Sequence, residues 1–257
     1  MANSISKFKK NIYSQFGEDG IIEELLLRLQ KNVALDHWCV EFGAWDGIYL
    51  SNTCNLIKNK KYNAVLIEGN PIKANELHFN FPENNIHKIC KFVDFFGENS
   101  LDNILSQTPI PIDFDFLSID IDGVDYHVFD SLKKFTPKVI CIEFNPTIPN
   151  AVEFVQKKDF SVKQGSSAKS LKKLANEKGY KLVACTTCNL ILVRESLFFF
   201  LDEPEKNLET LYPEGNDAHY IFVGYDGTIL SNKDKLTLHY HNNIDVPMNK
   251  IQFLPYY

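Results

Sequence analysis

Arginine is almost absent from this sequence. Its 257 residues contain 25 lysines but only two arginines, Arg28 and Arg194. Arginine is the side chain that clamps phosphate or carboxylate through two parallel hydrogen bonds, so an anion site here must use lysine, backbone amides or a metal. The net charge is −6, and the lysines are spread along the chain. A nucleic-acid partner held by bulk charge is therefore not expected.

Long apolar runs are missing as well. No segment approaches 18 uninterrupted apolar residues, and the N-terminal MANSISKFKK lacks the apolar centre of a signal peptide. We therefore expect no membrane span and a soluble, cytoplasmic protein. The six cysteines lack the spacing of a disulfide framework. Cys185 and Cys188 have CxxC spacing without a second pair or a histidine cluster, which favours core packing over metal or redox chemistry.

The order of apolar segments predicts an α/β fold. Short runs rich in Val, Ile and Phe alternate with amphipathic stretches at least five times. We expect strands at 38–43, 63–68, 86–93, 115–121 and 138–144, helices at 48–59, from Pro71 and at 167–178, and a hairpin of 180–187 with 189–195. This pattern predicts a Rossmann-like, mostly parallel sheet with helices on both faces, to which the C-terminal hairpin adds an antiparallel edge strand.

The chain is expected to form one domain over residues 1–257. Residues 1–30 are predicted to be an N-terminal helical cover, because apolar residues recur there at helical spacing. Residues 31–195 would form the cofactor-binding core. Residues 196–257 would be a C-terminal extension, and their position after the core suggests a lid over the acceptor.

Each of the five predicted parallel strands ends in a carboxylate. These residues are Glu41, Glu68, Asp94, Asp120 and Glu143. Ligands of open parallel sheets bind at the carboxyl ends of the strands. One or two acids there are expected of any solvated edge, but five predict a polar ligand bound across the sheet.

The turn after the first strand favours one class of nucleotide-like ligand. Its spacing is Gly43-x-x-x-Gly47, with Trp45 where a dinucleotide motif has its second glycine. Glu41 would repel a phosphate and suits a cationic amino-acid group, while Glu68 suits a ribose diol. These features favour S-adenosylmethionine (SAM).

Three motifs resemble those of a known family. Residues 40–47, VEFGAWDG, followed by Ser-Asn-Thr at 51–53, resemble the first motif of class I SAM-dependent methyltransferases. They are closest to the FkbM-like branch of polysaccharide and natural-product gene clusters. Residues 13–20, YSQFGEDG, resemble a further hallmark of that branch, and residues 115–123 resemble its fourth-strand motif. The resemblance covers residues 11 to about 195 and implies the class I methyltransferase sheet.

The resemblance also implies roles for individual residues. Glu41 and Gly43 would contact the methionine portion of SAM, Glu68 the ribose hydroxyls, and Asp94 would lie near the adenine. Gln15 and Glu18 would close the pocket from the N-terminal segment, although Glu18 and Asp19 could instead stabilise the helix start by electrostatics or capping. The implied cofactor-binding set is Gln15, Glu18, Glu41, Gly43, Asn52, Glu68, Asp94 and Asp120.

Methyl transfer to a hydroxyl requires loss of its proton, and the sequence leaves two routes open. A side-chain base could be Asp120, Asp122, Asp125 or His127. Alternatively, Mg²⁺ or another divalent cation could be held by Asp122, Glu143 and Asn145, whose oxygens suit such ions. Asp122 could instead cap the following helix, and His127 could be an ordinary surface residue.

The function favoured is a SAM-dependent O-methyltransferase acting on a carbohydrate hydroxyl, in a surface polysaccharide or a nucleotide-linked sugar. A small-molecule or sugar substrate is therefore expected. Two alternatives remain: an NAD-dependent oxidoreductase on a similar sheet, and a catalytically silent methyltransferase-like binding module. Nothing in the sequence decides between a monomer and a homodimer.

Overall fold

Seven strands form one twisted sheet at the centre of the molecule. The computed structural model describes residues 4–213, 218–225, 228–233 and 251–253. The sheet has the order β3-β2-β1-β4-β5-β7-β6, and β7 is antiparallel to both of its neighbours. The strands are β1 (Trp38–Phe42), β2 (Asn63–Glu68), β3 (Ile86–Cys90), β4 (Phe116–Ile119), β5 (Val139–Glu143), β6 (Tyr180–Cys185) and β7 (Asn189–Arg194). The predicted Rossmann-like, mostly parallel sheet is confirmed.

The C-terminal hairpin enters the sheet differently from the prediction. Its antiparallel strand is not at the edge, because β7 lies between β5 and β6. Residues 189–193 of β7 are all buried, whereas β6 includes the half-buried Lys181. A strand that is apolar on both faces gains most from the interior position, so β6 is left at the edge.

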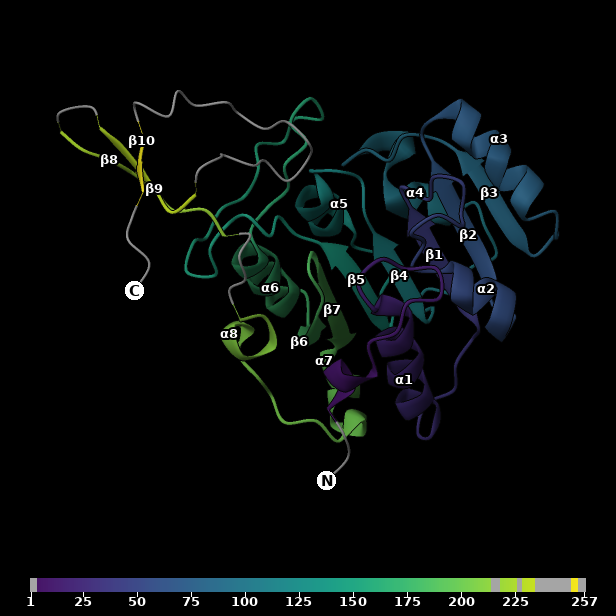
Figure 1. Cartoon of the computed structure of the whole chain (residues 1–257). Helices are drawn as coiled ribbons and strands as arrows, with labels where there is room; N and C mark the ends of the chain where they lie inside the picture. The colour runs from purple at the N-terminus through teal and green to yellow at the C-terminus, as the bar shows by residue number, and fades with distance from the viewer. Residues whose placement is uncertain (1–3, 214–217, 226–227, 234–250, 254–257) are drawn as a thin grey trace.

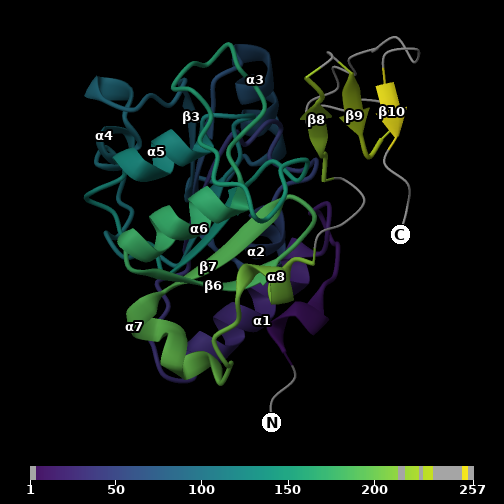
Figure 2. The same cartoon turned by 90° about the vertical axis from the view of Figure 1, so that its left-hand side faces the viewer.

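Helices cover both faces of the sheet, as predicted (Figures 1 and 2). One apolar cluster joins the sheet to α1 (Glu18–Gln30), α2 (Cys54–Lys60), α3 (Pro71–Asn80) and α7 (Glu195–Phe198). The cluster on the other face includes α4 (Leu101–Leu105), α5 (Asp125–Ser131) and α6 (Ala168–Glu177). The sheet is therefore buried on both sides, and its polar ligands can approach only from the strand ends.

Two element boundaries differ from the predictions by three residues or more. The helix expected from residue 48 begins at Cys54, and the strand expected to reach residue 93 ends at Cys90. Residues 51–53 are held instead as a loop by the Glu41 side chain. Pro71 does begin α3, and the Asn70 side chain caps that helix by accepting from Ile72 N–H.

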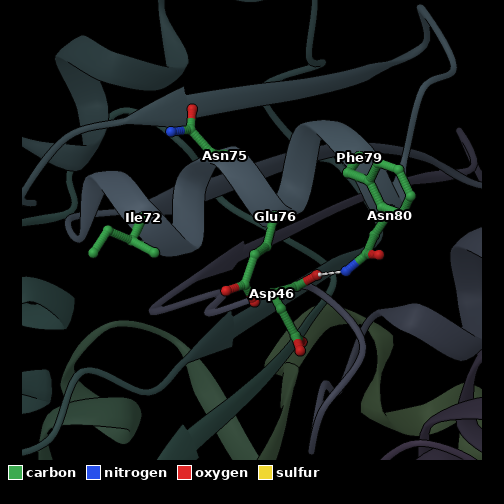
Figure 3. A pocket seen from close by; sticks show the side chains of 6 residues that line it. All are labelled: Asp46, Ile72, Asn75, Glu76, Phe79 and Asn80. Atoms are coloured by element: carbon green, nitrogen blue, oxygen red, sulfur yellow. Dashed lines mark hydrogen bonds between the residues drawn. The ribbon is translucent and has the colours of Figure 1, made fainter.

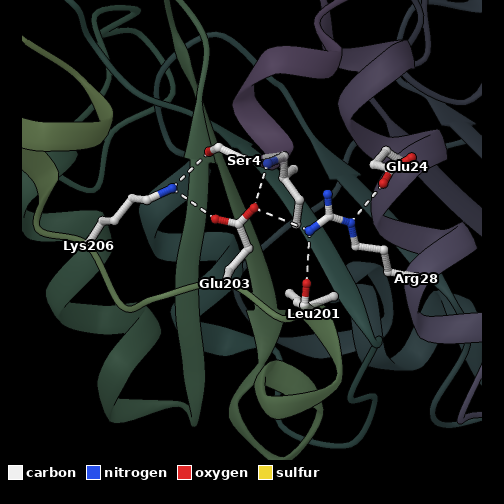
Figure 4. Close-up of polar contacts among 7 residues, drawn as sticks. Ser4, Glu24, Arg28, Leu201, Glu203 and Lys206 are labelled. Atoms are coloured by element: carbon white, nitrogen blue, oxygen red, sulfur yellow. Dashed lines mark hydrogen bonds and ion pairs between the residues drawn. The ribbon is translucent and has the colours of Figure 1, made fainter. Parts of the chain in front are cut away.

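The segment after the core packs back onto the N-terminal helix (Figure 4). The Arg28 guanidinium contacts Glu24 at 2.8 Å, the Leu201 carbonyl at 2.9 Å and Glu203 at 3.3 Å. Glu203 also accepts a hydrogen bond from Ile5 N–H. The neighbouring Ser4 hydroxyl accepts one from the Lys206 side chain. The short elements here are η1 (Ile5–Phe8), η3 (Phe199–Leu201) and α8 (Leu208–Leu211).

A small second sheet follows, formed by β8 (Ile221–Val223), β9 (Ile229–Ser231) and β10 (Ile251–Phe253). In Figures 1 and 2 it stands apart from the main sheet. Within the described ranges, no helix combines the length and the apolar character needed to cross a membrane.

Candidate functional site

A cavity of about 390 Å³ opens at the carboxyl ends of the central strands. The chain leaves β1 toward β2 on one side and leaves β4 toward β5 on the other, so a crevice forms between these strand ends. The lining residues come from the N-terminal segment, the loop after β1, the ends of β4 and β5, and the β6–β7 turn. They are Gln15, Phe16, Glu18, Leu50, Asn52, Asp120, Asp122, Glu143, Pro146, Thr187, Cys188 and Asn189.

Three carboxylates meet in this cavity. One oxygen from each of Asp120, Asp122 and Glu143 lies within 4.8 Å of the others. The parallel register of Ile119 with Ile142 explains why Asp120 and Glu143 are neighbours. Burial, and then the nearby Glu143 carboxylate, raise the pKa of Asp120 well above its usual range. The site thus concentrates negative charge where a cation or a hydroxyl donor could bind.

Asp125 organises the turn that places two of these carboxylates. Its side chain accepts from Ile121 N–H at 2.8 Å and from Gly123 N–H at 2.9 Å. Asp122 is exposed and has a left-handed backbone with φ 59°. Burial raises the pKa of Asp125 to about 6. The bonds that hold the start of α5 therefore come from Asp125, while Asp122 faces the cavity.

The N-terminal segment is held over the cavity by Asp19. One oxygen of its buried carboxylate accepts from the amides of Ile12, Tyr13 and Ser14, at 2.8, 2.7 and 2.8 Å. These bonds fold the chain so that Gln15, which follows directly, reaches the cavity. From the sequence, Asp19 was expected at most to stabilise the helix start, and its bonds to the preceding amides were not predicted.

Glu18 lines the cavity and is fully buried. Its carboxylate accepts from Phe16 N–H at 2.7 Å and from the side-chain nitrogen of Asn189 at 3.1 Å. It therefore links the N-terminal segment to the first residue of β7.

Glu41 shapes the cavity without lining it. Its buried carboxylate accepts from Ser51 Oγ at 2.6 Å, Asn52 N–H at 2.8 Å and Thr53 Oγ1 at 2.7 Å. Burial nevertheless leaves the pKa of Glu41 raised. Asn52 lines the cavity, and its side chain donates to Ser118 Oγ. The described contacts of Glu41 therefore fix the loop that presents Asn52.

Gly43 is required by the close approach of the β4 end. Its φ is +76°, and a Cβ atom there would lie 1.7 Å from the Asp120 carbonyl oxygen. Any side chain would push the chain that carries Asp120 away.

Glu68 and Asp94 lie at the ends of β2 and β3 and do not line the cavity. Glu68 accepts from Trp45 N–H at 2.8 Å and Asn70 N–H at 2.7 Å. Asp94 accepts from its neighbour Phe95 N–H. Glu68 therefore joins the turn after β1 to the turn after β2. It does not belong to the group of three carboxylates in the cavity.

His127 and Asn145 also lie outside the lining. The Nε2 atom of His127 is 2.7 Å from the Gln156 carbonyl, so this ring faces the 156–165 loop. The Asn145 side-chain oxygen accepts from both Thr147 N–H and Thr147 Oγ1. Because β5 ends at Glu143, strand alternation no longer places residue 145 beside it.

The β6–β7 turn contributes Cys188, which was predicted to pack in the core, and Asn189, which was expected only as a strand residue. Cys188 and Asn189 are buried, and both line the cavity. All six cysteines are free, and burial raises the pKa of the Cys185 thiol to about 12. The sequence feature that could have indicated Asn189 is its polar side chain at the start of an otherwise apolar strand.

A second hollow, of about 590 Å³, lies along α3 (Figure 3). Asn80 donates there to the Asp46 carbonyl, and Ile72 and Phe79 are largely exposed. It contains none of the residues predicted to bind cofactor or metal.

Comparison with known proteins gives a family match over the second half of the core. Residues 98–182 match the family model described as the methyltransferase FkbM domain. This segment includes Asp120, Asp122 and Glu143. The resemblance to FkbM-like SAM-dependent methyltransferases that the motifs indicated is thereby confirmed. No curated protein matches the chain.

Among solved structures, the chain is similar to the CMeT domain of the citrinin polyketide synthase, with 10% identity and a TM-score of 0.41. It is also similar to M. capricolum TrmK bound to S-adenosyl-homocysteine, with 15% identity and a TM-score of 0.38. The matches cover 72% and 65% of this chain, and 55% and 65% of those chains. The chain thus spans less than two thirds of either relative.

Proposed function

We propose that this chain, with its FkbM-type methyltransferase domain, transfers the methyl group of SAM to a carbohydrate hydroxyl. The observation that carries the proposal is the charge of the cavity. Glu18, Asp120, Asp122 and Glu143 line it, and none of its described lining residues is Lys or Arg. Such a site suits a cationic sulfonium cofactor and hydroxyl donors, whereas the pyrophosphate of NAD would be repelled.

The reaction moves one methyl group and one proton. The acceptor oxygen attacks the methyl carbon, and the sulfur leaves with the bonding electron pair as S-adenosylhomocysteine (SAH). We assign Asp120 to receive the hydroxyl proton, because its carboxylate lines the cavity beside Asp122 and Glu143. His127 does not carry this role in the proposal, since its ring faces Gln156.

We further propose a divalent cation at Asp122 and Glu143, beside Asp120. Their carboxylate oxygens form the hard donor set that Mg²⁺ prefers, and they lie within 4.8 Å of one another. When bound, such an ion lowers the pKa of a hydroxyl it contacts. Chelation followed by dialysis should abolish turnover, and added Mg²⁺ should restore it. Full activity after chelation would remove the ion from the proposal.

The substrate class is tested with SAM labelled in its methyl group. Nucleotide-linked sugars and oligosaccharides should accept label, whereas a simple phenol and an RNA should not. Asp120→Asn should lower turnover about 100-fold or more. Asp130→Asn, an exposed change on α5, is the matched control and should leave it unaltered. Labelling of the phenol or RNA alone would overturn the carbohydrate assignment.

The acceptor role of the C-terminal extension is also a proposal. Residues up to 213 are structural, because Leu201 and Leu208 are buried in the main clusters. Beyond them, His219 N–H donates to the Thr147 carbonyl, close in sequence to Pro146 of the cavity. A chain ending at Pro213 should therefore still bind SAH but lose turnover. Unchanged turnover would contradict the acceptor role.

A further inference from the structure

Asn189 places an unsatisfied oxygen beside the cavity. The residue is 5% exposed, and its side-chain oxygen has no hydrogen-bond partner within the part of the chain that the structure describes. Leaving a buried carbonyl oxygen without a partner is unfavourable, because the oxygen loses its hydrogen bonds to water and gains none. Most buried polar groups are paired, so this oxygen requires an explanation.

The orientation of the Asn189 amide is set by its neighbours. Its nitrogen donates to Glu18 at 3.1 Å and contacts Cys188 Sγ at 3.6 Å. A flipped amide would bring its oxygen against the Glu18 carboxylate, which can only accept while ionised. Glu18 is itself fixed by Phe16 N–H. The oxygen of Asn189 is therefore held on the side of the amide group that faces away from Glu18.

The strand register places Asn189 beside the carboxylate cluster. Asn189 of β7 is paired directly with Glu143 of β5 in the antiparallel register. Side chains of directly opposed residues share one face of the sheet, with Cβ atoms about 4.5–5.5 Å apart. Glu143 belongs to the cluster with Asp120 and Asp122. Asn189 and the three carboxylates thus line one cavity whose described lining contains no Lys or Arg.

We propose that the Asn189 side-chain oxygen is a ligand of the divalent cation held at Asp122 and Glu143, and that Glu18 is its positioning residue. This inference rests on the proposed function, which places the cation there. Amide oxygen is a suitable ligand for Mg²⁺ or Mn²⁺. Asn145, the amide ligand expected from sequence, already uses its oxygen to accept from Thr147. Asn189 takes that place from a neighbouring strand.

The test is the binding of Mn²⁺ to the full chain in the absence of SAM and substrate. Binding is measured by the electron paramagnetic resonance signal of free Mn²⁺ and by calorimetry. Asn189→Ala should weaken Mn²⁺ binding about 10- to 100-fold, the loss typical of a perturbed metal environment. Asn189→Asp should bind at least as tightly as the wild type, because a carboxylate oxygen replaces the amide oxygen. Glu18→Gln should lie between Asn189→Ala and the wild type.

Thr187→Val is the matched control, because Thr187 lines the same cavity and the change keeps its shape. It should bind Mn²⁺ as the wild type does, and Mn²⁺ should raise its melting temperature equally. Wild-type binding with an unaltered affinity in Asn189→Ala would overturn the inference and leave the proposed cation in place. No Mn²⁺ binding by the wild type would overturn both. Loss of SAH affinity alone in Asn189→Ala would assign this oxygen to the cofactor instead.

Discussion

Asp19→Asn should release the N-terminal segment from the cavity. In the wild type, one carboxylate oxygen accepts three backbone amides, at 2.7 to 2.8 Å. Hydrogen bonds to a charged group contribute about 1.5–3 kcal/mol each, against about 0.5–1.5 kcal/mol for neutral ones. The isosteric change keeps an acceptor but removes the charge. A loss of about 1 kcal/mol per bond gives about 3 kcal/mol for this segment.

Native-state hydrogen exchange measures that loss directly. The amides of Ile12, Tyr13 and Ser14 should exchange about 100-fold faster in Asp19→Asn, since 1.36 kcal/mol corresponds to a factor of ten. SAH affinity should fall as well, because Gln15 and Phe16 belong to the same segment. Glu23→Gln, on the same helix, removes a partly exposed ion pair with Lys60 and should leave these amides unaltered. Equal protection of the three amides in Asp19→Asn would refute the reasoning.

Three further changes test the scaffold of the site. Lys138→Met should lower the free energy of unfolding in urea by about 3–5 kcal/mol, because it leaves the fully buried Asp115 without its cation. The control Lys133→Met changes an exposed side chain and should alter that free energy by under about 1 kcal/mol. A cost below about 1 kcal/mol for Lys138→Met would contradict this. Asp125 has a raised pKa of about 6 in the folded chain, so its contribution to stability is complete below pH 4 and is lost as the pH rises through 6. The contribution lost over this pH range is about 3 kcal/mol by linkage. The curve of unfolding free energy against pH should therefore be flatter by that amount in Asp125→Asn than in the wild type, and parallel curves for the two proteins would contradict this. Gly43→Ala should destabilise the chain by about 3 kcal/mol or more in the same assay, and a neutral result would show that the Asp120 carbonyl can move aside.

The sequence was sufficient for the sheet because its strands are short apolar runs separated by turn residues. It also located Asp120 and Glu143, since each stands at the end of a buried strand. Asp120 and Glu143 meet because β4 and β5 are parallel neighbours, an arrangement that alternating strands and helices predict.

The contacts that shape the cavity were harder to predict, because they depend on tertiary pairing. Glu41 was expected to contact the cofactor, and the structure shows its oxygens bound to residues 51–53. The neighbourhood of Glu143 and Asn189 depends on β7 lying between β5 and β6. Sequence reasoning had placed the antiparallel strand at the edge, so it had no reason to consider Asn189. The role of Asp19 was missed because it binds the amides of the preceding segment, and no periodicity in the sequence indicates such bonds.

Calorimetric titration of the full chain with SAH, with NAD as the comparison, tests the central claim most directly. The account predicts that SAH binds with one site per chain and that NAD does not bind. The cavity is lined by carboxylates, and none of its described lining residues is a Lys or Arg that could bind a pyrophosphate. Binding of NAD without binding of SAH would contradict the account.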